Sequence, residues 1–197
     1  MDVSIIIATY GDQSWLLEGN DTSMSLTADF SDIPIIRLHS TESQLHMVRN
    51  KAASIAYTEW LCFVDAGDSL SPDYFDQMKK ATGDLRAPRL TFVDPLTKLG
   101  HEPFDLTKRD MNTGNPCPIG TLIRYDMFED AQEFWNEEAY EDWSLFRRAW
   151  LLGATIEHTD AMYYAIDKPN SRNKKVDDPI SLVRQIQYSH EEWYGDI

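Results

Sequence analysis

Two aspartates lie directly after a short apolar segment in the first half of the chain. Residues 61–64 read Leu-Cys-Phe-Val, which predicts a strand buried on both faces. Asp65 and Asp68 follow this strand, with Gly67 between them. In open α/β sheets, ligands bind in the crevice at the carboxyl ends of the strands. Because hard divalent cations prefer carboxylate oxygens, this pair fits a cation that holds a phosphorylated substrate.

A structural interpretation fits the same turn. Asp, Gly and Ser are favoured in strand-to-helix turns, so Asp68 or Ser71 would serve as the N-cap of the next helix. Pro72 would then occupy the first helical position. The turn by itself leaves both the metal site and the helix cap open.

A second acidic cluster lies in a predicted helix at 137–152. Its carboxylates are Glu137, Glu138, Glu141 and Asp142. Acids gather in the first turn of a helix because the helix dipole favours negative charge there, which accounts for the first two. The last two lie about one turn further in, and Arg147 and Arg148 are close enough to form ion pairs with them. A structural ion-pair cluster and a catalytic pair both remain open.

The apolar periodicity predicts an α/β chain. Strands are expected at 3–8, 33–38, 61–64, 89–93, 121–125, 154–157 and 162–166, and helices at 43–57, 74–82, 137–152 and from 178 onward. Residues 13–32 are expected to form a loop with short helical pieces, and 94–118 a long loop. The strand, helix, strand order around residue 50 favours a parallel sheet.

Bulk composition limits the classes of function. The 197 residues fit one domain, and a net charge of -15 opposes loose binding to nucleic acid or anionic membranes. Cys62 and Cys117 have no metal-ligand spacing and are too few for a disulfide framework, which favours a reducing cytoplasm. No basic signal-peptide start is present, and no apolar run approaches the roughly 20 residues of a membrane span. We expect a soluble, cytoplasmic protein.

Several short motifs follow one another in an informative order. They are Thr9-Tyr10 after the first strand, Arg49-Asn50 in a helix, Asp65-Ala66-Gly67-Asp68 followed by Leu70-Ser71-Pro72, and Glu141-Asp142-Trp143 with the later Arg147. This order resembles the family 2 glycosyltransferases of the GT-A fold. Members of that family transfer a sugar from a nucleotide donor with inversion.

The resemblance implies an architecture and an activity. The architecture is a single GT-A (Rossmann-like) α/β domain with a mostly parallel central sheet flanked by helices. Residues 1–95 would form the nucleotide-sugar-binding half, and 96–197 the acceptor-binding half with a C-terminal helix. The activity is metal-dependent, inverting transfer from a UDP- or GDP-sugar to a hydroxyl of a saccharide, a peptide or a modified nucleobase. The acceptor would lie between the loop at 98–118 and the predicted helix at 137–152.

The resemblance also implies residue roles. Donor-binding positions would be Thr9, Tyr10, Asp12, Arg49, Asn50 and Asp65. Asp68, with Asp65, would bind the Mn²⁺ or Mg²⁺ that bridges the diphosphate. Asp142 would be the general base, and Glu141 would help to position it or the acceptor. The chemistry requires such groups, because a cation offsets the charge that builds on the diphosphate and a carboxylate accepts the proton of the hydroxyl.

Three features depart from the family pattern. Gly67 replaces the middle acid, so metal binding would rest mainly on Asp68. The donor region before Arg49 is short, and the segment at 163–168 lacks the histidine that some relatives carry. His39, His46 and His158 are left outside the predicted metal site.

A basic loop offers further donor contacts. Arg172 and Lys174 belong either to a solvated loop or to a lid that closes on the diphosphate. Two other functions stay open. One is a catalytically weakened module that binds a sugar nucleotide or a partner, and the other is a nucleotidyltransferase.

Overall fold

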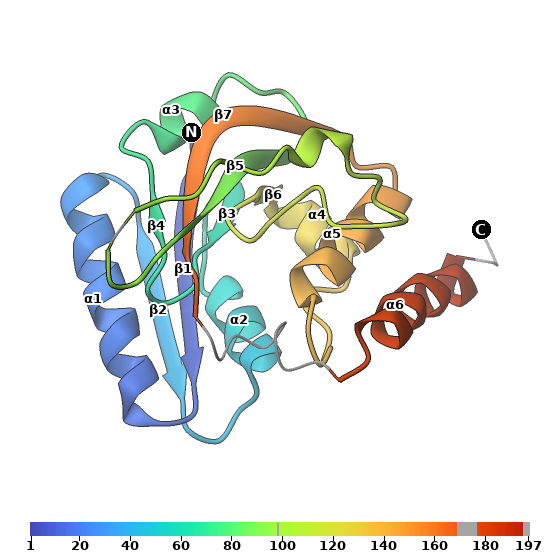
Figure 1. Cartoon of the computed structure of the whole chain (residues 1–197), viewed down its shortest axis with the longest axis horizontal. Coiled ribbons are helices and arrows are strands. Elements are labelled where there is room, and N and C mark those ends of the chain that lie inside the picture. Colours follow the sequence, from blue (N-terminus) through green and yellow to red (C-terminus); the bar gives the residue numbers. More distant parts are fainter. Residues whose placement is uncertain (98, 169–176, 195–197) are drawn as a thin grey trace.

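Seven strands form one sheet in the computed structural model, which describes residues 1–97, 99–168 and 177–194 (Figure 1). The strands are β1 (Val3–Tyr10), β2 (Ile35–Ser40), β3 (Trp60–Phe63), β4 (Ser69–Leu70), β5 (Leu85–Val93), β6 (Leu122–Arg124) and β7 (Ile156–Ile166). The helices are α1 (Gln13–Asp29), α2 (Leu45–Ala53), α3 (Tyr74–Met78), α4 (Tyr125–Asp130), α5 (Glu141–Leu151) and α6 (Pro179–Tyr194), with a 3-10 turn at Leu106–Lys108.

The strand order is β2-β1-β3-β6-β5-β7-β4. β1 is parallel to β2 and β3, and β5 is parallel to β7. β6 runs antiparallel between β3 and β5, and β4 is antiparallel to β7. Five strands therefore share one direction, and the predicted mostly parallel sheet is confirmed.

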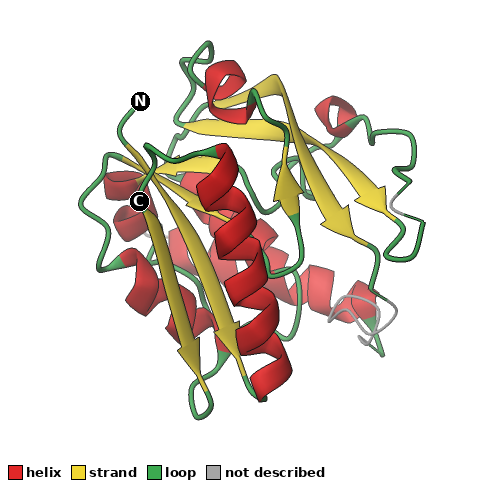
Figure 2. Cartoon of the chain, turned by 90° about the vertical axis from the view of Figure 1, so that its left-hand side faces the viewer, coloured by secondary structure: helices red, strands yellow, loops and turns green. Residues whose placement is uncertain are grey.

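Helices cover both faces of the sheet (Figure 2). Ile5 and Ile7 pack with Leu26 and other residues on the face of α1 and α3, whereas Ile6 packs on the face of α2 and α5. Successive side chains of a strand point to opposite faces, so consecutive isoleucines require cover on both sides. β1 accordingly lies inside the sheet, between β2 and β3.

The prediction of a loop at 13–32 is wrong, because helix α1 occupies most of this segment. Asp12 caps this helix by accepting a 2.8 Å hydrogen bond from the Ser14 backbone N–H. Its buried face is formed by Gly19, Thr22 and Leu26, so only one of its three inward positions carries a large apolar side chain. Gly19 lies where a Cβ atom would meet the Thr9 side chain at 3.0 Å, which explains a small residue inside the helix.

The helix-cap interpretation of the acidic turn is also wrong. α3 spans five residues and has Asp73 at its N-cap position, after the short strand β4. The strands expected at 154–157 and 162–166 are one strand, β7, with a register shift opposite Ala87 and Arg89. Helix α4 was not expected, and β5 begins four residues before the predicted 89–93.

α5 begins at Glu141 rather than at 137. Tyr140 has φ 59° and ψ 28°, the left-handed conformation, which a right-handed helix cannot continue through. Glu141 and Asp142 are therefore the first two helical residues, and the helix dipole acts on them. Glu137 and Glu138 lie in the preceding loop.

Candidate functional site

The first carboxylate pair lies just after β3 and is tied to β7. The Tyr163 hydroxyl donates to Asp68 Oδ2 at 2.8 Å and accepts from the Asp65 backbone N–H at 3.1 Å. The Ile166 backbone N–H donates to Asp68 Oδ1 at 2.8 Å. A β7 tyrosine therefore connects the two aspartates, and the sheet sets their positions.

Gly67 has a structural cause in this turn. Its φ of 92° is left-handed, and a Cβ atom there would lie 2.5 Å from Glu18 Oε1 and 3.0 Å from Lys168 Nζ. Lys168 pairs with Glu18 at 2.7 Å and donates to the Ala66 carbonyl oxygen at 2.7 Å. The ends of these two flexible side chains could move aside, so it is the backbone conformation of the turn, which residues with a Cβ atom rarely adopt, that accounts for Gly67.

The second carboxylate pair opens α5. Asp142 Oδ1 accepts from the Trp143 backbone N–H at 2.8 Å, and Oδ2 accepts from Asn115 Nδ2 at 3.0 Å. Trp143 Nε1 donates to the Met111 carbonyl oxygen at 2.9 Å. The long loop between β5 and β6 therefore packs directly on the start of α5 and reaches the predicted base.

Arg49 of α2 joins the two pairs. Its guanidinium donates to Asp65 Oδ1 and to Glu141 Oε1, each at 2.6 Å, and it lies 4.9 Å from the centre of the Phe134 ring. The residue is 3% exposed. Burial lowers the pKa of this guanidinium, but the charges of Asp65 and Glu141 outweigh it, and the pKa is raised overall. Arg49 is held as a cation between two carboxylates.

The other member of each pair has a raised pKa. Burial, followed by the charge of Asp65, raises the pKa of Asp68 to about 8. Burial, followed by the charge of Glu141, raises the pKa of Asp142 to about 7. Perturbed carboxylates that lie together are typical of functional sites, since structural ion pairs usually lower a carboxylate pKa.

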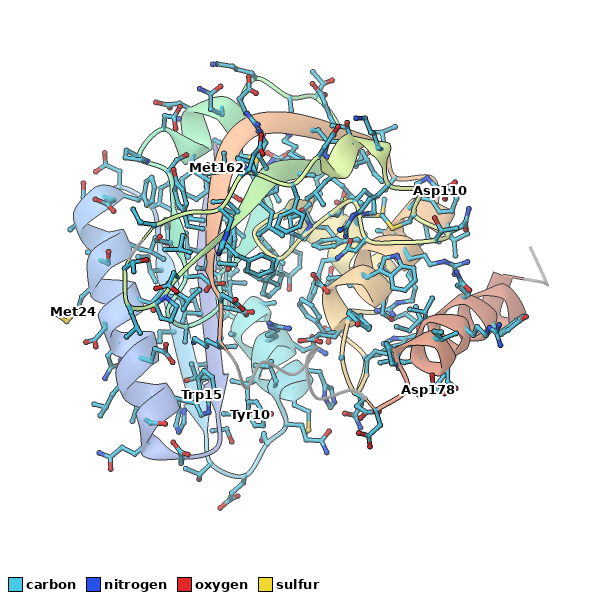
Figure 3. All side chains as sticks on the ribbon, in the orientation of Figure 1. Tyr10, Trp15, Met24, Asp110, Met162 and Asp178 are labelled. Atoms are coloured by element: carbon cyan, nitrogen blue, oxygen red, sulfur yellow. The ribbon has the colours of Figure 1, made fainter. Side chains whose placement is uncertain are left out.

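A cavity of about 260 Å³ adjoins this cluster. Tyr10 lines it from the end of β1, Leu45 and His46 from the start of α2, and Glu141 together with the loop at 135–138 from the side of α5. Figure 3 shows Tyr10 in the lower part of the view, at the same end of the molecule as Trp15. Two predicted site residues, Tyr10 and Glu141, therefore face one cavity.

A larger cavity, of about 540 Å³, lies elsewhere on the molecule. It is lined by α3, the loop at 103–107, Arg89 of β5 and the start of β7, where burial lowers the pKa of His158. None of the predicted site residues that the structure describes lines it. This larger cavity is therefore separate from the two carboxylate pairs.

The remaining predicted donor residues have protein partners. Thr9 is buried, and its hydroxyl lies 3.0 Å from His39 Nδ1. Asn50 donates from Nδ2 to the Phe134 carbonyl oxygen at 2.9 Å, and its Oδ1 accepts from the Phe134 backbone N–H at 3.0 Å. Asp12 is the cap of α1. Their donor-binding roles stay predictions, and Arg172 and Lys174 lie outside the described residues.

The aspartates after β3 fit a divalent cation that binds together with a diphosphate. Each oxygen of Asp68 accepts one hydrogen bond and keeps a second lone pair, and the Asp65 side chain is 46% exposed. Within the described residues, no group of three or more His, Cys, Asp or Glu could hold a metal alone. The residues therefore fit a cation with one or two carboxylate ligands, completed by phosphate and water oxygens as Mg²⁺ often is.

The arrangement of strands and helices defines a class of protein: a single α/β domain with a GT-A-like, Rossmann-like fold. The chain is similar to residues 1–349 of S. aureus TarS in complex with UDP-GlcNAc, with a TM-score of 0.59 and 14% identity over 98% of this chain and 73% of that chain. The UDP complex of the same fragment has a TM-score of 0.57 and 15% identity over 100% of this chain and 72% of that chain.

A longer TarS structure has a TM-score of 0.58 and 14% identity over 98% of this chain and 44% of that chain. No family model and no curated protein matches the sequence. At these identities the similarity concerns the fold. In the part of the chain that the structure describes, no helix combines the length and the apolar character needed to cross a bilayer.

Sequence reasoning missed two residues that hold the cluster together. Tyr163 stands in an apolar strand segment beside Tyr164, a pattern typical of core positions. Asn115 stands in a long loop, where only the neighbouring prolines, Pro116 and Pro118, indicate a fixed conformation. Their roles became visible only through their contacts with Asp68 and Asp142.

Proposed function

We propose that the protein is a metal-dependent, inverting glycosyltransferase that moves a sugar from a nucleotide-diphosphate donor to an acceptor hydroxyl. The observation that carries the proposal is the bridge made by Arg49. It links a carboxylate at the end of β3 to a carboxylate at the start of α5, at 2.6 Å on each side. This bridge brings a site suited to a diphosphate next to a carboxylate suited to proton abstraction.

The 260 Å³ cavity supports a nucleotide-sugar donor. Tyr10 and Trp135 contribute two aromatic rings to its lining, and aromatic rings provide flat apolar surface for a base or a sugar ring. The similar TarS structures contain UDP-GlcNAc and UDP, which favours a uridine donor over a guanosine donor.

Asp142 acts as the general base in this proposal. A hydroxyl is a poor nucleophile until a positioned carboxylate accepts its proton, an effect of about 10²- to 10⁴-fold. A pKa of about 7 suits this task, because a substantial fraction of the group is ionised at neutral pH and the carboxylate is still basic enough to accept a proton. One base on the acceptor side, with no covalent intermediate, gives inversion at the anomeric carbon.

Asp68 and Asp65 would hold Mn²⁺ or Mg²⁺, which supplies charge neutralisation for the diphosphate leaving group. Arg49 keeps Asp65 and Glu141 in position and compensates their charges. Both cysteines, Cys62 and Cys117, are buried and unpaired, which fits the reducing cytoplasm proposed as the setting.

Donor turnover tests the proposal. The protein is incubated with Mn²⁺ and a panel of UDP- and GDP-sugars, and the release of nucleoside diphosphate is measured with saccharide, peptide and nucleoside acceptors. We expect diphosphate release with one donor class and its loss in Asp142→Asn. Binding of donors without any turnover would identify a binding module instead, and release of pyrophosphate would identify a nucleotidyltransferase.

A further inference from the structure

Asn115 lies in the long loop that follows β5 and is held there by several contacts. Arg109 Nη1 donates to the Asn115 carbonyl oxygen at 3.3 Å, and the next two residues, Pro116 and Cys117, are buried. Met111 is 3% exposed and accepts the Trp143 indole N–H through its carbonyl oxygen. Figure 3 shows Asp110, from the same loop, on the right-hand side of the molecule. The segment around Asn115 is therefore anchored to α5.

The orientation of the Asn115 amide follows from its partners. Oδ1 accepts from the Cys117 backbone N–H at 2.9 Å, and a backbone N–H can be met only by the carbonyl end of an amide. Nδ2 is therefore the atom that faces Asp142 Oδ2 at 3.0 Å. An amide N–H donates, so this contact favours the ionised carboxylate.

Asn115 provides the tertiary hydrogen bond to this carboxylate. The other bond to Asp142 comes from the backbone N–H of the next residue, Trp143, at 2.8 Å, and belongs to the helix itself. We infer that Asn115 is a positioning residue for the reaction: it fixes the rotation of the Asp142 carboxylate and keeps it ready to accept the proton of the acceptor hydroxyl. This inference rests on the proposed function.

Several charged groups also surround Asp142. Glu141 of α5 and Asp65 after β3 repel the ionised form, and Arg49 of α2 attracts it. The Cys117 thiol is also near, and burial raises its own pKa, so it stays protonated. These neighbours remain when Asn115 is replaced. Removal of the amide donor is therefore expected to raise the pKa of Asp142.

The test compares Asn115→Leu, which keeps the branched shape of the side chain and removes both polar atoms, with wild type. We expect the acidic limb of the kcat/KM profile to move up by about one pH unit, since a hydrogen bond to the charged form is lost. At pH 7 kcat falls at least about tenfold, while the Kd of the nucleotide sugar measured by calorimetry changes less than about twofold. Thr113→Ala, at an exposed position of the same loop, serves as the matched control and keeps the wild-type profile.

A second variant and a second readout keep the inference falsifiable. Asn115→Asp places another carboxylate opposite Asp142 and is expected to shift its titration further upward than leucine does. The titration is followed by the ¹³C shift of the Asp142 carboxyl, which requires no turnover. If wild type transfers no sugar, the proposed function fails, and the ¹³C titration still tests Asn115. An unchanged Asp142 titration in folded Asn115→Leu and Asn115→Asp overturns the inference.

Discussion

The two carboxylate pairs have the same design. In each pair one acid, Asp65 or Glu141, is paired with Arg49, and the other, Asp68 or Asp142, has a raised pKa and accepts hydrogen bonds from neutral donors. One buried cation thus serves two acids, because its planar guanidinium can donate in two directions at once.

The pairs differ in the part of the fold that holds them. Asp68 accepts from Tyr163 and Ile166, both of β7, so the sheet fixes the pair after β3. Asp142 accepts from Asn115 in the long loop, outside any strand. Loops tolerate change in sequence and length better than sheet strands do. Changes in this loop should therefore alter catalysis while donor binding is kept.

Removal of Arg49 should have the largest effect because it breaks both pairs. Arg49→Met removes the guanidinium that contacts the Glu141 carboxylate, whose side chain is 12% exposed. We expect the free energy of unfolding, measured by urea denaturation, to fall by about 3 kcal/mol. Transfer is lost at the same time.

Arg49→Lys is the matched control. A lysine ammonium keeps the charge but cannot donate to two carboxylates in a planar fork, so stability should recover in part and transfer should not. Full stability in Arg49→Met would show that the bridge is not a stabilising contact.

Asp142→Asn separates the two pairs. The amide keeps the shape of the side chain and cannot accept a proton, so kcat should fall by about 10²- to 10⁴-fold. The Kd of the nucleotide sugar, measured by calorimetry, should stay within about twofold of wild type. Asp160→Asn, at an exposed acid that lines the larger cavity, is the control and should retain full activity. Normal turnover in Asp142→Asn would exclude this residue as the base.

Asp68→Ala tests the pair after β3. With Mn²⁺ present, donor affinity should fall by at least about tenfold, a loss typical even of groups that only orient a metal ligand. After chelation of the metal with EDTA, wild type and variant should bind the donor equally weakly. A variant that keeps the full effect of Mn²⁺ in calorimetry would remove Asp68 from the metal site.

The pH dependence sharpens the assignment of Asp142. Because its pKa is raised to about 7, kcat/KM should rise by about tenfold per unit below pH 7 and level off above it. The native state also holds this proton more tightly than the unfolded chain does. Stability therefore falls as pH rises from about 4 to 7, by at most about 1.4 kcal/mol per unit. In Asp142→Asn, stability measured by thermal unfolding should no longer show the decrease with rising pH that this carboxyl group causes.

The smallest expected effect concerns the backbone before α5. Tyr140 has a φ of 59°, a conformation that costs a residue with a Cβ atom about 1 kcal/mol. Tyr140→Gly and Tyr140→Ala both remove the ring, and only glycine removes the strain. In denaturant unfolding we expect the glycine variant to be about 1 kcal/mol more stable than the alanine variant. Equal stabilities would show that this conformation is not strained.

The sequence predicted the elements whose pattern is local and apolar. The isoleucines of β1 and the apolar residues before Asp65 indicated buried strands, since their side chains require cover on both faces. α1 was not recognisable, because Gly19 and Thr22 on its buried face fit against Thr9 and the Gly67 turn instead of forming an apolar stripe. The start of α5 was missed because the residue type at position 140, a tyrosine, does not indicate a left-handed backbone.

The sequence by itself indicated which carboxylates are candidates for the chemistry, since acids at the end of a buried strand and at the start of a helix can be recognised from residue type and neighbours. Only the tertiary structure decided which of them lie together. Arg49 meets Asp65 and Glu141 because β6 inserts between β3 and β5 and places α5 beside α2 on one face of the sheet. Contacts between residues so distant in the chain depend on strand order, which local patterns do not encode.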